Sequence, residues 1–197
     1  MRVIAGTARG RRLSPPPDRS IRPTADRVKE ALFSIITSRR GTWEGGVVLD
    51  LCAGTGSLGI EALSRGASRA IFGDTSSAAI RIISTNLSLT GFHERGELFR
   101  RDWRDLLTTL SSRGERFDVV FADPPYASGI DAEIPPAVIS LHLLNPGGIL
   151  AIEHDAQRIL PTLADHGIVY TLKRYGATAL SIYERTDDRR EEESRCP

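Results

Sequence analysis

From residue 47 onward, short apolar runs typical of β-strands alternate with amphipathic runs typical of helices. This alternation constrains the fold most, because it indicates βαβ units around a parallel sheet. Strands are expected near residues 47–50, 70–74, 96–100, 117–122, 148–153, 168–174 and 178–183, with helices near 57–65, 77–89, 103–112, 131–142 and 156–165. Only residues 175–177 separate the last two strands. The prediction is an α/β fold whose seven-stranded, mostly parallel sheet ends in an antiparallel hairpin and carries helices on both faces.

A chain of 197 residues suits a single domain with a substantial core. Residues 1–23 are rich in Gly, Arg and Pro and are expected to form an extended basic N-terminal extension. The main domain should span residues 24–185 and begin with an amphipathic helix over 24–38. Residues 186–197 are charged and polar, which predicts a disordered end.

Composition excludes several classes of protein. Charged residues make up 26% of the chain and apolar residues 40%, as in ordinary globular enzymes. Cys52 and Cys196 have neither disulfide-framework spacing nor zinc-ligand spacing, so both are expected to be free thiols, with no metal site. No run approaches the roughly 18 apolar residues of a membrane span. We expect a cytoplasmic monomer.

Positive charge is concentrated at the N-terminus. Residues 1–40 contain ten Lys or Arg against three Asp or Glu, whereas the remaining residues contain 16 against 22. The net charges are therefore +7 and −6, derived from these counts. A basic segment of this kind is either a solvated tail, a lid over the neighbouring crevice or a surface that binds nucleic-acid phosphates.

A glycine-rich loop follows the first strand of the predicted sheet. Gly54-Thr55-Gly56-Ser57-Leu58-Gly59 fits the G-x-G-x-x-G pattern, and Asp74 lies twenty positions after Gly54. This pattern alone permits a dinucleotide-binding oxidoreductase, in which the later acidic residue holds ribose hydroxyls.

Acidic residues at successive strand ends favour a different cofactor. Asp50 ends the first strand, where it would repel a pyrophosphate but attract an ammonium group. S-adenosylmethionine carries that group, together with a ribose for Asp74 and an adenine for Asp102 and Trp103. Alternatively, Asp50 and Asp102 are ordinary loop or N-cap residues. The predicted cofactor site comprises Asp50, Ala53, Gly54, Thr55, Gly56, Asp74, Asp102 and Trp103.

The apolar strand over residues 117–122 runs directly into Asp123-Pro124-Pro125-Tyr126. Ligands of open α/β sheets bind outside such carboxyl ends. An exocyclic amine of a base is a poor nucleophile, because its lone pair is delocalised, and two acceptors can orient it. We expect the Asp123 carboxylate and the Pro124 carbonyl to accept its two N–H bonds, and Tyr126 to stack on the base. The alternative is a simple turn after a strand.

Taken together, these elements resemble the class I methyltransferase fold and, within it, the bacterial small-subunit rRNA guanine-N2 methyltransferases. The resemblance spans almost the whole chain and rests on residues 1–6, 48–56, 123–126 and 144–148, on Asn86-Leu87, and on Arg22-Pro23-Thr24 with Arg27. It implies methylation of a guanine N2 amine in 16S rRNA, within the small subunit or an assembly intermediate. Predicted RNA contacts are Arg2, Arg9, Arg11, Arg12, Arg22, Thr24 and Arg27. Asp74 departs from the family's usual Glu, and Cys52 stands where the family often has Phe.

Three alternatives stay open. A DNA adenine-N6 methyltransferase shares the Asp-Pro-Pro-Tyr loop but normally needs further mass to recognise a DNA sequence. A protein-glutamine methyltransferase favours Asn at the position of Asp123. The last alternative is an RNA-binding module without catalytic activity, which the intact loops disfavour.

Overall fold

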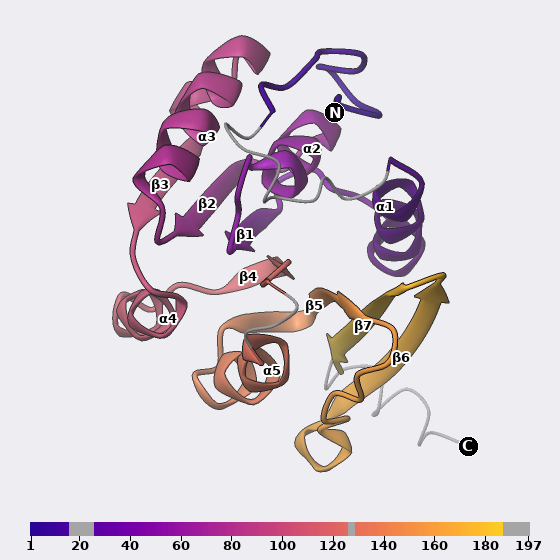
Figure 1. Ribbon diagram of the computed structural model, residues 1–197. Helices are drawn as coiled ribbons and strands as arrows, with labels where there is room; N and C mark the ends of the chain where they lie inside the picture. Colours follow the sequence, from indigo (N-terminus) through magenta and orange to yellow (C-terminus); the bar gives the residue numbers. More distant parts are fainter. Residues whose placement is uncertain (16–25, 126–128, 187–197) are drawn as a thin grey trace, which may run out of the picture.

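A computed structural model describes residues 1–15, 26–125 and 129–186 and confirms the predicted sheet. Its seven strands lie in the order β3-β2-β1-β4-β5-β7-β6 (Figure 1). The strands are β1 (Val47–Leu51), β2 (Arg69–Asp74), β3 (Gly96–Arg100), β4 (Phe117–Ala122), β5 (Leu144–Asp155), β6 (Ile168–Tyr175) and β7 (Thr178–Arg185). Strands β1, β2, β3, β4 and β5 pair in parallel with their neighbours in the sheet, and β7 pairs antiparallel with both β5 and β6.

Helices cover both faces of the sheet, as expected. The described helices are α1 (Asp26–Arg40), α2 (Ser57–Arg65), α3 (Ser77–Thr90), α4 (Trp103–Ser112) and α5 (Ile130–Ser140), with short 3₁₀ turns at η1 (His93–Arg95) and η3 (Ala164–His166). One apolar layer joins α1, α2 and α3 to the sheet, through residues such as Leu32, Ile60 and Ile83. The other layer joins α4 and α5 to the opposite face, through Leu106 and Val138.

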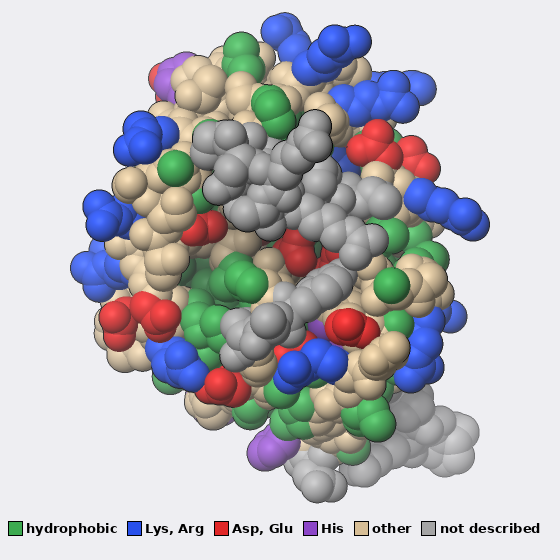
Figure 2. Space-filling view, viewed as in Figure 1, with side chains coloured by type: hydrophobic (Ala, Val, Ile, Leu, Met, Phe, Trp, Pro, Cys, Tyr) green, Lys and Arg blue, Asp and Glu red, His purple; other side chains and the backbone are tan. Residues whose placement is uncertain are grey.

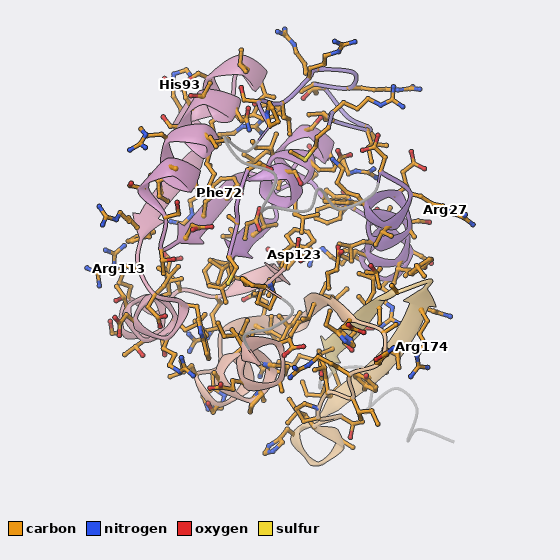
Figure 3. All side chains as sticks on the ribbon, viewed as in Figure 1. Arg27, Phe72, His93, Arg113, Asp123 and Arg174 are labelled. Carbon is orange, nitrogen blue, oxygen red and sulfur yellow. The ribbon has the colours of Figure 1, made fainter. Side chains whose placement is uncertain are left out.

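Helix α2 lies unusually close to the sheet because of a glycine. A Cβ atom on Gly59 would stand 2.3 Å from Cε1 of Phe72 in β2, well inside contact distance. The third glycine of the loop motif therefore lets the helix pack directly on the strand. Figure 3 labels Phe72 beside β2, in this layer.

The helix expected near residues 156–165 is wrong. The chain forms turns and irregular backbone there, with only the 3₁₀ turn η3 at its end. Pro161 cannot donate a helical hydrogen bond, and its carbonyl instead accepts from the Tyr183 hydroxyl at 2.8 Å. The start of the segment is also held, because Gln157 N donates to the Asp155 carboxylate at 2.8 Å.

The described part of the N-terminal extension is not an extended appendage. Val3, Ala8 and Leu13 are buried and belong to the same core cluster as α1, α2 and α3. Arg2 and Arg12 form an antiparallel bridge, so residues 1–15 fold back on themselves. Its Gly, Arg and Pro content suggested an extended segment, but three buried apolar side chains pack it against the domain. The expected boundary at residue 23 lies outside the described residues.

At the other end, Thr186 N donates to Gly167 O at 3.0 Å, so this first residue of the expected tail is still attached to the domain. Residues 187–197 lie outside the described residues. Among the helices that the structure describes, none combines the length and the apolar character needed to cross a membrane.

Candidate functional site

Four acidic residues meet at the carboxyl edge of the sheet, where the strand order reverses between β1 and β4. Asp50 lies in β1 and Asp74 ends β2, while Asp102 and Asp123 directly follow β3 and β4. Figure 3 labels Asp123 near the middle of the molecule, beside the end of β4. Such a reversal point is the usual ligand crevice of an open α/β sheet.

The pKa of the Cys52 thiol reflects both burial and the acidic residues at this edge. Burial raises the pKa of its thiol to about 12, and the charges of Asp74, Asp123, Asp50 and Asp102 add to this effect. All four carboxylates therefore act on one point beside the glycine loop. The thiol therefore stays protonated at neutral pH, and Cys52 is not an activated nucleophile.

Asp50 is 2% exposed, and its carboxylate accepts a hydrogen bond from Gly59 N at 2.9 Å. Burial raises its pKa to about 7, against the lowering effect of the Gly59 bond, and the charge of Asp74 raises it further. Asp50 thus ties β1 to the first turn of α2. Its predicted contact with an ammonium group stays a prediction.

Asp74 shapes two neighbouring segments. One carboxylate oxygen accepts from Gly54 N at 2.9 Å and the other accepts from Ser76 N at 2.8 Å. Each oxygen has a second lone pair that can accept from a ribose hydroxyl. The side chain is half-buried, so the predicted ribose contact is compatible with its position.

The glycine loop needs its two glycines for backbone geometry. Gly54 and Gly56 have φ values of 56° and 75°, in the left-handed region that disfavours other residues. Ala53 N donates to Gly73 O at 3.0 Å, which joins the loop to β2. Between the glycines, the Thr55 carbonyl accepts from the Asn86 side chain at 2.9 Å. The sequence pattern predicted no site role for Asn86, although its place on the side of the helix that carries Ile83 and Leu87 was a usable signal.

Asp102 and Trp103 begin α4. Asp102 is exposed and caps the helix, since its carboxylate accepts from Arg104 N at 2.9 Å. Trp103 is a core residue, packed with the α4 and α5 cluster, and its indole N–H has no hydrogen-bond partner in the described part of the chain. The N-cap role is therefore real, and the predicted adenine contacts of both residues stay predictions.

The Asp-Pro-Pro loop emerges from β4 with Pro124 buried and Asp123 half-buried. Beyond it, Gly129 has a φ of 74° and precedes α5. Asp131 at the start of α5 is buried, and its carboxylate forms an ion pair with Arg158 Nε at 2.7 Å, which fixes the far side of the loop. Tyr126 lies outside the described residues.

The predicted RNA contacts divide into two groups. Arg2, Arg9, Arg11, Arg12 and Arg27 are exposed, whereas Arg22 and Thr24 lie outside the described residues. Arg9 and Arg12 form no ion pair with any other described residue. Figure 2 shows most Lys and Arg side chains around the rim of one face, with several acidic side chains nearer its middle.

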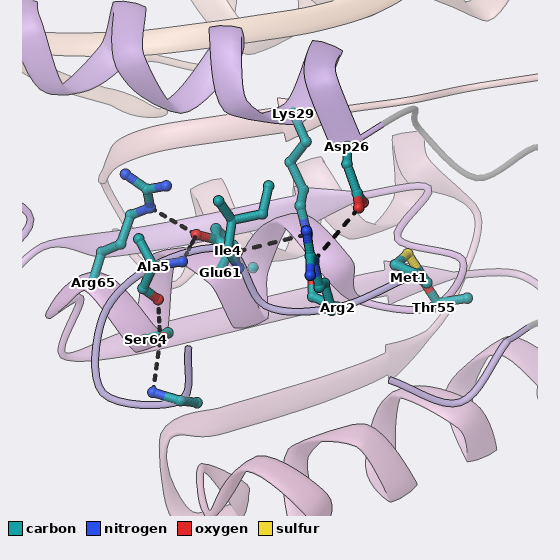
Figure 4. A network of polar contacts seen from close by, with 12 residues as sticks. Met1, Arg2, Ile4, Ala5, Asp26, Lys29, Thr55, Glu61, Ser64 and Arg65 are labelled. Atoms are coloured by element: carbon teal, nitrogen blue, oxygen red, sulfur yellow. Dashed lines mark hydrogen bonds and ion pairs between the residues drawn. The ribbon is translucent and has the colours of Figure 1, made fainter. Parts of the chain in front are cut away.

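A buried ionic network holds the N-terminal segment against α2 (Figure 4). Glu61 is 0% exposed and accepts from Ile4 N at 2.7 Å and from Ala5 N at 3.0 Å. Lys29 Nζ lies 3.6 Å from this carboxylate, Arg65 Nε lies 2.9 Å from it, and both neutralise its charge. Lys29 also donates to Arg2 O at 2.8 Å. One turn further along α2, Ser64 Oγ donates to Ala5 O at 2.6 Å.

Fold and site together define a class I, Rossmann-like methyltransferase. The chain is similar to a solved Thermus thermophilus protein, with 29% sequence identity and a TM-score of 0.81. The match covers 95% of this chain and 99% of that protein. The chain belongs to the family described as "Conserved hypothetical protein 95", which matches residues 1–184.

Named relatives agree with this class. "Putative rRNA methyltransferase YlbH" of Bacillus subtilis is 35% identical, with 94% of this chain and 99% of the relative covered. "Ribosomal RNA small subunit methyltransferase D" of Escherichia coli is 31% identical, with coverage of 94% and 90%. The chain is therefore a methyltransferase, and S-adenosylmethionine is the cofactor of this class, as the sequence predicted.

Asp50→Asn should change the pH dependence of stability. Because the pKa of Asp50 is raised from 3.8 to about 7, the folded protein keeps a proton that the unfolded chain releases. The stability from this group is complete below about pH 4 and is lost as the pH rises through about 7, at about 1.4 kcal/mol per pH unit. Urea unfolding across this window should show a decline in the unfolding free energy of the wild type relative to the variant. Parallel pH profiles would contradict the assignment.

Glu61→Ala should lower the unfolding free energy by about 3–5 kcal/mol, because the buried Lys29, the partly exposed Arg65 and two backbone N–H groups lose their partner. The matched control is Glu97→Ala. Glu97 also pairs with two arginines, Arg69 and Arg113, but is 40% exposed, so its loss should cost less than about 1 kcal/mol. Chemical denaturation measures both variants. Equal losses would mean that the Glu61 network is no stronger than a surface pair.

Proposed function

We propose that this protein transfers a methyl group from S-adenosylmethionine to the exocyclic N2 amine of a guanine in 16S rRNA. The observation that carries the proposal is the position of Asp123 and Pro124. They follow β4 at the point where the strand order reverses, next to the glycine loop that follows β1. A base held by these acceptors would therefore lie against the cofactor site.

The acidic edge suits this cofactor better than a dinucleotide. Burial raises the pKa of Cys52, and the charges of four carboxylates raise it further, so negative charge is concentrated beside the glycine loop. A pyrophosphate would be repelled there, whereas a sulfonium and an ammonium group are attracted. Residues 53–56 and Asp74 would hold the cofactor. Asp50, in the strand β1 that precedes this loop, would contribute negative charge when it is ionised. When bound, S-adenosylmethionine supplies the electrophilic methyl group.

The remaining chemistry is positioning. Asp123 carboxylate and Pro124 carbonyl accept the two N–H bonds of the amine, so the nitrogen lone pair is directed toward the cofactor side of the crevice. Pro124 and Pro125 fix two successive φ angles, which keeps this arrangement rigid. Tyr126 stacks on the base. Most of the rate enhancement comes from holding the two reactants at near-attack distance in an environment suited to the charge change.

Two features support RNA as the substrate. The exposed arginines of residues 1–15 and Arg27 form a positive surface on a domain whose remaining residues are net acidic. The Escherichia coli relative is named as a small-subunit rRNA methyltransferase, and it covers 94% of this chain. We propose that the small ribosomal subunit, or an assembly intermediate, is the particle bound.

Asp123→Ala should reduce kcat on unmethylated small subunits by at least about tenfold, equivalent to roughly 1.4 kcal/mol of barrier, because the amine loses its charged acceptor. Asp123→Asn keeps one acceptor oxygen and should retain intermediate activity. Calorimetry should show that affinity for S-adenosylmethionine falls much less than turnover in both variants, because three of the four carboxylates at this edge remain. If the alanine variant keeps more than about a tenth of wild-type turnover, Asp123 does not orient the amine.

Replacing Arg2 and Arg12 together with Ala should weaken binding to small subunits and make it less dependent on salt. Each lost phosphate contact should reduce the slope of log affinity against log salt by about 0.7–0.9. The matched control replaces Arg113 and Arg116. Both are exposed near the start of β4, at the sheet edge opposite the candidate site. Filter binding at several salt concentrations measures both. If the two double variants show equal salt slopes, Arg2 and Arg12 do not belong to the RNA-binding surface.

A further inference from the structure

Asn86 joins two segments that lie far from it in the sequence. It lies in the interior of α3 and is 0% exposed. Its amide nitrogen donates to Thr55 O in the glycine loop at 2.9 Å. On the other side, its carbonyl oxygen accepts from Ser14 N at 2.7 Å, and the amide also donates to Ser14 O at 3.4 Å. One buried side chain therefore links the glycine loop to the N-terminal segment.

The bond to Thr55 restrains a part of the loop in which the two flanking residues are glycines and restrict the backbone little. Thr55 stands between Gly54 and Gly56, whose left-handed conformations are open to many alternatives in the absence of other contacts. Helix α3 supports the loop at a second point, because a Cβ on Gly56 would already stand 3.1 Å from Ile83 Cγ2. Asn86 thus holds the direction of the Thr55 carbonyl, in the peptide unit between Thr55 and Gly56.

The N-terminal segment also reaches the loop by a second route. Met1 Sδ accepts a weak hydrogen bond from Thr55 Oγ1 at 3.7 Å. Figure 4 shows Met1 and Thr55 together at one end of the network that holds this segment. Both ends of the folded-back segment, at Met1 and at Ser14, therefore meet the same loop residue, either directly or through Asn86.

We propose that Asn86 is a positioning residue for cofactor binding, and that through it the seating of residues 1–15 sets the affinity for S-adenosylmethionine. This inference rests on the proposed role of residues 53–56 in holding the cofactor. A ligand that binds residues 1–15 only in their seated position, such as an rRNA contacting their arginines, then also strengthens cofactor binding. Thermodynamic linkage requires the reverse effect to be equal.

Asn86→Asp separates the two sides of the link. The new side chain keeps an acceptor for Ser14 N–H but places a second acceptor against Thr55 O. We expect the dissociation constant for S-adenosylmethionine to rise roughly tenfold, as for a lost buried hydrogen bond. The KM for the cofactor should rise with it, while kcat changes much less, because the groups proposed to hold the amine are untouched.

Asn145→Asp is the matched control. Asn145 is half-buried, and its amide donates to Asp118 Oδ1 at 3.3 Å, so the same substitution again brings two acceptors together. It lies near the start of β4, at the edge opposite the glycine loop. Thermal unfolding should show a loss of stability in both variants, but only the change at Asn86 should weaken cofactor binding.

Two further variants keep the inference testable if Asn86→Asp does not fold. Asn86→Ala removes all three side-chain bonds without adding a charge and should also weaken cofactor binding. Ser14→Pro removes only the N–H on the N-terminal side, and a smaller loss of affinity, roughly threefold, is expected. Wild-type cofactor affinity in folded Asn86→Ala and Ser14→Pro would overturn the inference.

Asp74→Ala distinguishes failure of the inference from failure of the proposed site. Asp74 holds Gly54 N and is the proposed ribose acceptor, so its loss should weaken S-adenosylmethionine binding by about the effect of one buried hydrogen bond or more. If Asp74→Ala weakens binding and the Asn86 variants do not, only the positioning role is wrong. If none of these variants weakens binding, residues 53–56 do not hold the cofactor.

Discussion

The reversal of strand order between β1 and β4 is the constraint on which the candidate site depends. Three α-helices and two strands separate β1 from β4 in the chain, yet the two strands are hydrogen-bonded neighbours, with Asp50 level with Phe121. Because the helices that follow them pack on opposite faces, their loops diverge at the carboxyl edge. The glycine loop and the Asp123 loop therefore lie side by side at this edge, at the one place among the described parallel strands where the strand order reverses.

Ionised acidic groups are costly at this edge because they are buried close together, and a bound cation would reduce that cost. Burial, together with neighbouring carboxylates, raises the pKa of Asp50 and of Cys52, so several negative charges compete for the same poorly solvated region. Such repulsion costs stability in the unliganded protein, and it is offset when a positively charged ligand binds. Asp74 and Asp50 also accept backbone N–H groups of the glycine loop and α2, from Gly54 and Gly59 respectively. Shape and charge of the crevice thus depend on the same side chains.

The N-terminal segment combines two structural features that are not evident from its composition. Its exposed arginines provide the positive surface, while its backbone is anchored by the buried Glu61, Lys29 and Arg65 network. A rigid basic surface loses less conformational entropy on contact with RNA than a free arm does. Because its ends also reach Thr55, directly from Met1 and through Asn86 from Ser14, this surface and the cofactor loop belong to one structural unit.

Local pattern was sufficient for much of this protein. The bounds of α2, α4, β3 and β4 follow from periodicity and capping signals, and the glycine loop and the Asp-Pro-Pro-Tyr loop are visible as strings of neighbouring residues. Tertiary structure decided the rest. The segment at 156–163 has a helical composition, but a long-range bond from Tyr183 and the missing N–H of Pro161 hold it in turns. Likewise, the seat of residues 1–15 and the role of Asn86 depend on contacts between residues 31 to 72 positions apart. Periodicity encodes which face of an element is buried, but not which distant polar group will meet it there.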